Sequence, residues 1–334
     1  MTKMLVTGGL GFIGSNFIEK IIQEKPEFQI INIDAKLIGS NSKNLSKIRN
    51  LKKYEFVNSN ITNKNIIEKM VKKVDVVVNF AAETHVDRSI INPEPFLKSN
   101  FYGVYTILES VKKFKKKIIQ ISTDEVFGSL KTKSANENFS LNPSNPYSAS
   151  KGAAELLVES YIKTYDCDAN ITRCTNNYGP KQSPEKLIPK AIMLAEKNQK
   201  IPIYGSGKNI RDWIFVNDHC DAILKVILDG KRGESYNISS NNEVNNLKLI
   251  KKILKIMDKP VDLIQHVNDR PGHDFRYSLN SSKIKKELKW QSKYNYEQGL
   301  IETIKWYQDN KEWSKMASPK LLKGHKWKKE GNKF

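Results

Sequence analysis

Tyr147 and Lys151 are four positions apart in the segment NPYSASKGAAELLVESYIKTY, residues 145–165. Pro146 favours a helix start, and the spacing then places both side chains on one helix face. A free tyrosine has a pKa of about 10, and a nearby ammonium group stabilises the phenolate and lowers that pKa. The pair can therefore act as a base toward an alcohol, although the same spacing also occurs on ordinary amphipathic helices.

Thr123, Asp124 and Glu125 directly follow the apolar segment KIIQIS, residues 117–122, which has the composition of a buried strand. Neighbouring carboxylates repel each other, and burial of either ionised form is costly. A purely structural role for this pair is therefore not the first expectation. The alternative is that polar turn residues simply end the strand.

A glycine-rich turn, VTGGLGFIGSNFIEKII at residues 6–22, lies between a strand pattern and an amphipathic helix. It contains Gly9-x-Gly11-x-x-Gly14, and Asp34 follows Gly14 by twenty residues. Glycines allow close backbone approach to a pyrophosphate at a helix N-terminus, and the carboxylate accepts hydrogen bonds from ribose hydroxyls. The motif predicts NAD binding, since Asp34 would repel the 2′-phosphate of NADP, whereas the neighbouring Lys36 acts against that preference. Beside such a cofactor, a tyrosinate can deprotonate an alcohol while hydride leaves its carbon.

Short apolar segments alternate with helix-length segments through the first half of the chain. The expected strands are residues 3–7, 29–33, 54–57, 75–80 and 117–122. This pattern predicts an α/β fold with a Rossmann-type doubly wound parallel sheet. After about residue 174 the alternation is less regular, which indicates a smaller, interwoven C-terminal substrate-binding lobe.

The expected division of the chain has three parts. The NAD-binding domain covers residues 1–175 with a returning segment at about 210–235, and the substrate-binding lobe covers 176–209 and 236–318. Residues 319–334 form a basic tail. The long helices expected at 95–114 and 146–165 carry apolar residues that either cover the sheet or, as a family resemblance of the chain implies, form a four-helix interface in a homodimer. Those residues are Phe101, Tyr105, Leu108, Leu157 and Tyr161.

The 334-residue chain has a formal net charge of +20, yet only 7 of its 56 basic residues are arginines. Without a nucleic-acid-binding motif, this charge indicates a lysine-rich surface, and no specific nucleic-acid partner is expected. No apolar run is long enough to cross a membrane, and no signal peptide is evident, so we expect a cytoplasmic protein. The three cysteines, Cys167, Cys174 and Cys220, lack metal-ligand spacing, and no metal site is expected.

Several motifs occur together in a characteristic order. They are the glycine-rich turn, NFAAETHVDRS, STDEVFG, YSASK, NNYGP, RDWIFVNDH and RPGHDFRY. This set resembles the extended short-chain dehydrogenase/reductases, and within them the nucleoside-diphosphate-glucose 4,6-dehydratases. The similarity runs from Met4 to about Trp306, and STDEVFG is its most specific part because related epimerases usually lack the Asp-Glu pair.

The resemblance implies a reaction in which C4 of the hexose is oxidised, water is eliminated across C5 and C6, and the hydride returns to C6. Tyr147 would take the C4 hydroxyl proton with Thr123 hydrogen-bonded beside it, and Lys151 would hold the tyrosinate and the nicotinamide ribose. Glu125 would remove the C5 proton. Asp124, kept protonated, would donate to the departing C6 hydroxyl, so acid and base stand together in different protonation states.

The resemblance also implies binding residues for both ligands. For NAD they are Gly8, Gly11, Phe12, Ile13, Gly14, Asp34, Asn60, Ile61, Ala81 and Ala82, with Tyr147 and Lys151. For the sugar nucleotide they are His85, Asn177, Lys186, Leu187, Arg211, Arg270 and His273. Surface ion pairs or helix-end contacts are the structural alternative for the charged members, and His85 could equally be a hydrogen-bonded histidine under the sheet edge.

Four positions depart from the family pattern. Phe127 replaces a common Tyr, Asn60 replaces an Asp that often meets the adenine, Ser183 replaces an aromatic residue, and Ser206 replaces an Asp. The last two lie in the lobe that selects the nucleotide. The substrate favoured by the resemblance is dTDP-glucose, and UDP- or CDP-glucose stays open. An NAD-dependent sugar-nucleotide 4-epimerase and a basic NAD-bound scaffold without turnover are the rival predictions.

Overall fold

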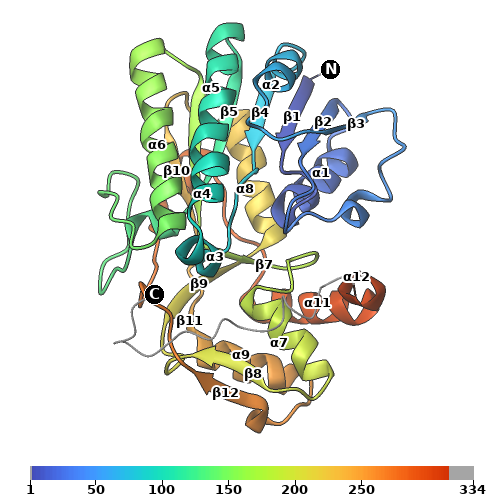
Figure 1. Cartoon of the computed structure of the whole chain (residues 1–334), viewed down its shortest axis with the longest axis vertical. Helices are drawn as coiled ribbons and strands as arrows, with labels where there is room; N and C mark the ends of the chain where they lie inside the picture. The colour runs from blue at the N-terminus through green and yellow to red at the C-terminus, as the bar shows by residue number, and fades with distance from the viewer. Residues whose placement is uncertain (1, 316–334) are drawn as a thin grey trace.

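The computed structural model describes residues 2–315, which form a larger lobe and a smaller lobe (Figure 1). The predicted basic tail at residues 319–334 lies outside the described residues. Within residues 2–315, none of the helices combines the length and apolar character needed to cross a membrane.

The larger lobe is built on one sheet with the strand order β10-β6-β5-β4-β1-β2-β3, and all neighbouring strands run parallel. The strands are β1 Thr2–Thr7, β2 Phe28–Asp34, β3 Tyr54–Asn58, β4 Val76–Asn79, β5 Lys117–Thr123, β6 Ala169–Cys174 and β10 Ser235–Ile238. The five strands expected from the sequence are all present, so the predicted Rossmann-type sheet is confirmed. The chain reverses its winding direction at β1, which lies between β2 and β4, and ligands bind at such a point in this class of sheet.

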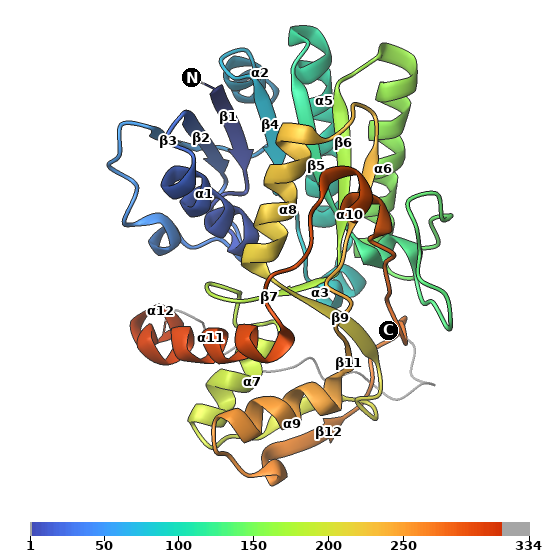
Figure 2. The same cartoon turned by 180° about the vertical axis from the view of Figure 1, so that it is seen from behind.

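Helices cover both faces of this sheet (Figures 1 and 2). On one face lie α1 Phe12–Glu24, α8 Val216–Asp229 and α10 Ser282–Leu288, and on the other α2 Lys64–Val71, α5 Gly103–Phe114 and α6 Pro146–Tyr165. Phe17 and Ile223 are fully buried on the first face, and Ile107 and Val158 on the second. Both faces of the sheet are therefore apolar, as expected for a parallel sheet covered on two sides.

The smaller lobe combines two short sheets with four helices. A three-stranded sheet holds β7 Asn176–Tyr178, β9 Ile210–Phe215 and β11 Glu243–Asn245, and β8 Ile201–Tyr204 pairs with β12 Ile264–Val267. The helices are α7 Leu187–Glu196, α9 Asn246–Ile256, α11 Tyr296–Asp309 and α12 Lys311–Lys315. They share a core that includes Trp213, Phe215 and Leu249.

Short helical elements connect these parts. They are η1 Ser42–Leu45, α3 Val86–Ile91, α4 Glu94–Phe96, the π-helical turn η2 Leu97–Tyr102, η3 Asp124–Phe127 and η4 Val261–Leu263. Of these, η3 follows β5 directly and α3 follows β4 after a short loop, so both lie at the carboxyl edge of the large sheet.

The lobe boundaries can be compared with the pairing of the strands. Strand β10 belongs to the large sheet, whereas β9 pairs with β7 and β11 of the smaller lobe. Ile284 and Trp290 pack into the core of the larger lobe. We therefore propose that the chain returns to the larger lobe at residues 216–238, and again at about 281–290.

A buried ion pair ties α6 to the sheet. The Nε and Nη2 atoms of Arg173, in β6, each lie 2.8 Å from Oε2 of Glu155, in α6. Their side chains are 2% and 0% exposed, and the guanidinium lies 5.1 Å from the ring centroid of Phe127. Since α6 also carries Tyr147 and Lys151, this pair helps to set the position of both.

Replacing Glu155 with Ala should lower the free energy of unfolding by about 3–5 kcal/mol, because Arg173 would stay buried without its counter-charge. Urea unfolding measures the loss. The control is Glu159→Ala, since Glu159 is 35% exposed and 3.9 Å from the same guanidinium. Its expected cost is under about 1 kcal/mol. Equal losses for the two variants would contradict the expectation.

Candidate active site

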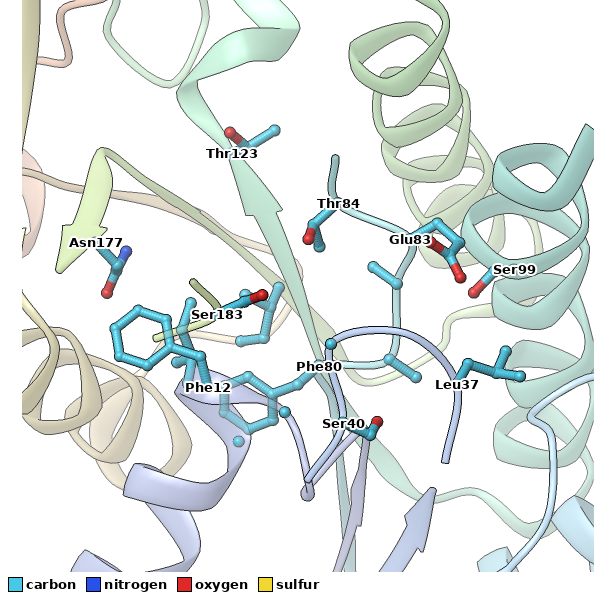
Figure 3. Close-up of a pocket in the computed structure, with 18 of the residues that line it drawn as sticks. Phe12, Leu37, Ser40, Phe80, Glu83, Thr84, Ser99, Thr123, Asn177 and Ser183 are labelled. Atoms are coloured by element: carbon cyan, nitrogen blue, oxygen red, sulfur yellow. The ribbon is translucent and has the colours of Figure 1, made fainter. Parts of the chain in front are cut away.

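A cavity of about 280 Å³ opens at the carboxyl edge of the large sheet, beside residues 174–186 (Figure 3). All residues with predicted cofactor or catalytic roles line it. They are Gly8, Gly11, Phe12, Ile13, Gly14, Asp34, Asn60, Ile61, Ala81, Ala82, Thr123, Asp124, Glu125, Tyr147 and Lys151. Asn177 and Lys186 also line it, whereas His85, Leu187, Arg211, Arg270 and His273 do not. The tertiary structure thus brings together two predicted groups that are far apart in the sequence.

The glycine-rich turn fits closely against the neighbouring backbone. Gly8 has a φ of +70°, and a Cβ atom there would lie 2.7 Å from backbone atoms of Ala81. A Cβ atom at Gly14 would lie 2.6 Å from the Gly8 carbonyl oxygen. At Gly11, which precedes α1, a Cβ atom would meet only that oxygen, at 3.2 Å, so this side of the turn is open. The turn can accept an anionic group against the N-terminus of α1.

The buried carboxylate of Asp34 organises the loop beside this turn. Its Oδ2 accepts from the Leu10 backbone N–H at 3.0 Å, and its Oδ1 accepts from Lys36 N–H at 2.8 Å and Ser40 Oγ at 2.7 Å. Oδ2 therefore keeps acceptor capacity for a ribose hydroxyl. The Lys36 ammonium lies 5.1 Å from the ring centroid of Phe56, so it has a partner other than a cofactor phosphate.

These residues fit a bound dinucleotide. The turn is free of side chains on its open side, a helix N-terminus faces it, and a carboxylate stands at the end of β2. Asn60 follows β3, and its Oδ1 accepts from the backbone N–H and the hydroxyl of Thr62, both at 2.9 Å. Its amide nitrogen, rather than its oxygen, is then the group left for an adenine.

Asp124 is buried, and its surroundings favour the protonated carboxyl. Burial and then the charge of Glu125 raise its pKa well above the ordinary value, while Arg211 acts in the opposite direction. Thr123 Oγ1 donates to its Oδ1 at 3.2 Å, and its buried Oδ2 has no hydrogen-bond partner among the described residues. A protonated carboxyl with an unpartnered oxygen at the cavity wall can donate a proton to a ligand.

Glu125 has a different environment although it is the next residue. Burial raises its pKa, but Arg270, Arg211 and Lys186 all act to lower it. Tyr277 Oη donates to its Oε2 at 3.4 Å. The pKa of Glu125 is still raised overall, but three cations favour its carboxylate, whereas a single cation, Arg211, does so at Asp124.

Helix α6 begins in a way that places Tyr147 at the cavity. Asn145 and Ser148 form a reciprocal capping box, Pro146 opens the helix, and the Tyr147 backbone N–H donates to Ser89 Oγ at 3.1 Å. Burial and the nearby Glu125 raise the pKa of the Tyr147 phenol well above its usual value, and a hydrogen bond with Thr123 opposes this. The phenol therefore needs added positive charge before it can act as a base.

Lys151 lies one helical turn beyond Tyr147 and is also buried. Its ammonium donates to the Ile121 carbonyl oxygen at 2.6 Å, and burial lowers its pKa to about 8 despite the opposing charge of Glu155. One of its N–H groups is thus used by β5, and two remain for other acceptors.

Arg211 and Arg270 of the smaller lobe lie outside the cavity lining, but their charges act on the carboxyl groups that line it. Arg211 donates to the carbonyl oxygens of Ile210, Phe275 and Asp274 at 2.7, 3.3 and 2.9 Å, and it lies 4.2 Å from the Tyr277 ring centroid. Its charge acts to lower the pKa of Asp124 and of Glu125, although burial leaves both raised.

Burial favours the neutral forms of His273 and His85 by lowering the pKa of each. Burial, with Arg270 and Arg211, lowers the pKa of His273 to about 4, even though Asp269 lies 2.6 Å from its Nδ1. Burial and Lys186 lower the pKa of His85 to about 2. The positive charge near the carboxyl pair therefore comes from arginine and lysine.

Residues 83–88 and 185–186 meet at one side of the cavity. Arg88 Nη1 lies 2.6 Å from Glu185 Oε2, and Lys186 Nζ donates to the Thr84 carbonyl oxygen at 2.8 Å. Two glutamates that the sequence did not single out also line the cavity: Glu83, which Figure 3 shows, and Glu185. Leu187 instead begins α7 and packs toward the core of the smaller lobe.

Asn176 is a residue that sequence reasoning missed. Asn177 is already engaged: its Nδ2 donates to the Thr175 carbonyl oxygen at 3.0 Å and its Oδ1 lies 2.9 Å from Nδ1 of buried His219. The side chain of Asn176 lines the cavity, and its buried Oδ1 has no partner in residues 2–315. The duplicated asparagine was a signal, but only the fold shows which amide is available.

The other three positions that depart from the family pattern are Phe127, Ser183 and Ser206. Phe127 is 1% exposed and its ring lies 5.9 Å from that of Phe139, so the missing hydroxyl leaves a packed apolar side chain. Ser183 lines the cavity, and Ser206 Oγ accepts from the Lys208 backbone N–H at 3.4 Å.

Comparison with known proteins assigns the family. The sequence profile of GDP-mannose 4,6 dehydratase matches residues 5–303. The chain belongs to this 4,6-dehydratase family. It is 42% identical to the dTDP-glucose 4,6-dehydratase of Streptomyces niveus over 316 residues, which cover 93% of this chain and 94% of that protein.

Solved structures agree with this assignment. The dTDP-glucose 4,6-dehydratase of Streptomyces venezuelae, crystallised with NAD, has a TM-score of 0.91 at 37% identity and covers 93% of this 4,6-dehydratase and 98% of itself. A UDP-glucose 4-epimerase from Thermotoga maritima has a TM-score of 0.85 at 26% identity, with 92% and 99% covered. The rival epimerases are therefore more distant relatives of this 4,6-dehydratase.

The raised pKa of Asp124 makes stability depend on pH. Between the ordinary carboxyl pKa of about 3.9 and the raised value, the folded 4,6-dehydratase holds a proton that the unfolded chain has released. Folding stability therefore falls as pH rises through this window, by at most about 1.4 kcal/mol per pH unit. Asp124→Asn does not titrate and should be increasingly more stable than the wild type toward high pH, which urea unfolding at pH 5 and pH 8 would measure. A stability difference that stays constant with pH would contradict the proton on Asp124.

Proposed function

We propose that this protein is an NAD-dependent nucleoside-diphosphate-glucose 4,6-dehydratase that converts dTDP-glucose into dTDP-4-keto-6-deoxyglucose and water. The observation that carries the proposal is the pair of adjacent buried carboxyls at the end of β5. Burial and Glu125 raise the pKa of Asp124, whereas three cations favour the carboxylate of Glu125. An epimerase has no use for such an acid beside such a base. The named relatives support dTDP as the nucleotide.

The first step is oxidation at C4 of the sugar. The bound cofactor supplies reversible hydride transfer. Tyr147 takes the proton of the C4 hydroxyl, with Thr123 hydrogen-bonded to it. The positive charge of the oxidised nicotinamide and of Lys151 would offset the burial that raises the Tyr147 pKa. The two free N–H groups of Lys151 suit the ribose hydroxyls.

The second step is elimination of water. Once C4 is a ketone, the C5 proton is acidic, and the Glu125 carboxylate removes it. Asp124 donates its proton to the C6 hydroxyl, which leaves as water as a C5=C6 double bond forms. Glu125, which would then hold the C5 proton, can return it to C5 when C6 is reduced.

The residues proposed to bind the sugar nucleotide combine amides and cations. Asn176 offers an unpaired amide at the cavity, and Lys186 lies close enough to Glu125 to lower its pKa. Arg270 and Arg211 add guanidinium groups suited to a diphosphate.

The test is incubation of the purified protein with dTDP-, UDP- and CDP-glucose, followed by mass spectrometry for loss of one water. We expect dTDP-glucose to react fastest. The Asp124→Asn/Glu125→Gln double variant should lose about 10²–10⁴-fold in the rate of dehydration. Oxidation of C4 should still convert NAD to NADH.

The control removes two negative charges elsewhere. Asp229 and Glu24 are each 52% exposed, and Asp229→Asn/Glu24→Gln should leave turnover unchanged. Dehydration that persists in the active-site double variant would overturn the proposed chemistry. Water loss from none of the three sugar nucleotides would favour the epimerase.

We also propose a homodimer through η2, α5 and α6. Large apolar side chains are exposed along these helices: Leu97, Phe101, Tyr102, Tyr105, Leu156 and Tyr165, between 37% and 58%. Of the positions expected from the sequence, Phe101 and Tyr105 belong to this surface, whereas Leu108 and Tyr161 are buried against the sheet. The two helices lie side by side (Figure 1), so the exposed residues can form one interface.

Sedimentation of the wild type should give twice the monomer mass of 38.3 kDa. Tyr102→Lys/Leu156→Lys should give a monomer, because two buried ammonium groups would oppose association. Val261→Lys/Ile301→Lys, at residues 58% and 48% exposed on the smaller lobe, should stay dimeric. A monomeric wild type at micromolar concentration would contradict the dimer.

The expected cytoplasmic location stays a prediction, supported by three unpaired cysteines.

A further inference from the structure

Asp87 connects the larger lobe to two segments of the smaller lobe. It lies in α3, and its side chain is 5% exposed. Its Oδ1 lies 3.0 Å from Nη1 of Arg270, which follows β12, and its Oδ2 accepts from the hydroxyl of Tyr204 at 2.7 Å, at the end of β8. Both carboxylate oxygens are thus used across the interface between the lobes.

Arg270, the ion-pair partner of Asp87, has one guanidinium N–H group without an acceptor in the described part of the chain. Its side chain is 16% exposed, and its buried Nε has no hydrogen-bond partner among residues 2–315. A buried arginine N–H without an acceptor is costly, so a ligand oxygen would relieve it. Asp87 binds Nη1, whereas the unpaired atom is Nε, and both atoms belong to one rigid planar guanidinium group.

The charge of a second carboxyl, that of Glu125, also acts on Arg270. Its pKa is raised by Asp87 first and Glu125 second, although burial opposes both. Burial acts to raise the pKa of Asp87, but the charge of Arg270 and the hydrogen bond from Tyr204 act to lower it, and the net lowered pKa favours the carboxylate. Without that charge, the carboxyl left to attract Arg270 would be Glu125, the proposed base.

We propose that Asp87 is a positioning residue, which holds Arg270 and Tyr204 so that the unpaired Nε–H group of Arg270 can bind the diphosphate of the sugar nucleotide. This inference rests on the proposed function. Asp87 does not line the cavity and contacts neither reacting atoms nor cofactor residues. Its effect should therefore appear in substrate binding and leave NAD binding intact.

The test compares Asp87→Asn with the wild type. The amide keeps the shape of the side chain and removes the charge that holds Arg270. We expect KM for dTDP-glucose to rise about tenfold or more, dTDP affinity measured by calorimetry to fall by a similar factor, and kcat to change less. NAD affinity should not change. Tyr204→Phe, which deletes one hydroxyl, should give a smaller shift in the same direction and serves if Asp87→Asn does not fold.

The matched control is Asp218→Asn. Asp218 is 1% exposed and accepts from the backbone N–H groups of Lys293 and Tyr294 at 2.9 and 3.0 Å, away from the cavity. It should lower thermal stability without changing KM or dTDP affinity. An equal change in KM for the control, or unchanged dTDP affinity in both Asp87→Asn and Tyr204→Phe, would overturn the role of Asp87.

The same measurements separate this inference from the proposed function. Wild-type protein that binds dTDP but removes water from none of the sugar nucleotides would overturn the proposed function, and the dTDP affinities of the variants would still decide the role of Asp87. Wild-type protein that dehydrates dTDP-glucose, with dTDP affinity unchanged by both variants, would overturn the inference alone.

Discussion

The burial of two adjacent carboxyl groups at the end of β5 is the constraint on which the rest of the site depends. Ionisation of both Asp124 and Glu125 in a desolvated site is strongly unfavourable, so their surroundings must separate their protonation states. The structure favours this separation through charge placement. Three cations act on Glu125, whereas Asp124 has one cation, Arg211, against burial and the repulsion of its neighbour.

The compensating charge comes largely from the smaller lobe. Arg211 is held by backbone carbonyls next to Tyr277, and Arg270 by the carboxylate of Asp87. The two-lobe architecture therefore has an electrostatic purpose as well as a binding one. The larger lobe supplies the reacting groups and the cofactor turn, and the smaller lobe supplies cations that set protonation and suit an anionic substrate.

Local signals in the sequence were sufficient for much of this. The glycine turn was predictable from its motif between a strand and a helix. The structure shows why glycine is needed there, since a Cβ atom at Gly8 or Gly14 would collide with backbone. The strands were predictable because apolar segments alternate with helices, and Tyr147 and Lys151 because one helical turn separates them. The availability of Asn176 rather than Asn177 was not predictable, since it depends on His219, which is distant in the sequence.

The sequence by itself therefore determined the strands and helices, the cofactor turn, the family and the candidate Asp-Glu pair, because each depends on neighbours within a few positions. The tertiary structure decided the different surroundings of the two carboxyls, the lowered pKa of His273 and the ion pair between Asp87 and Arg270. These properties arise from burial and from charges that approach through space, and no local pattern of residues specifies either.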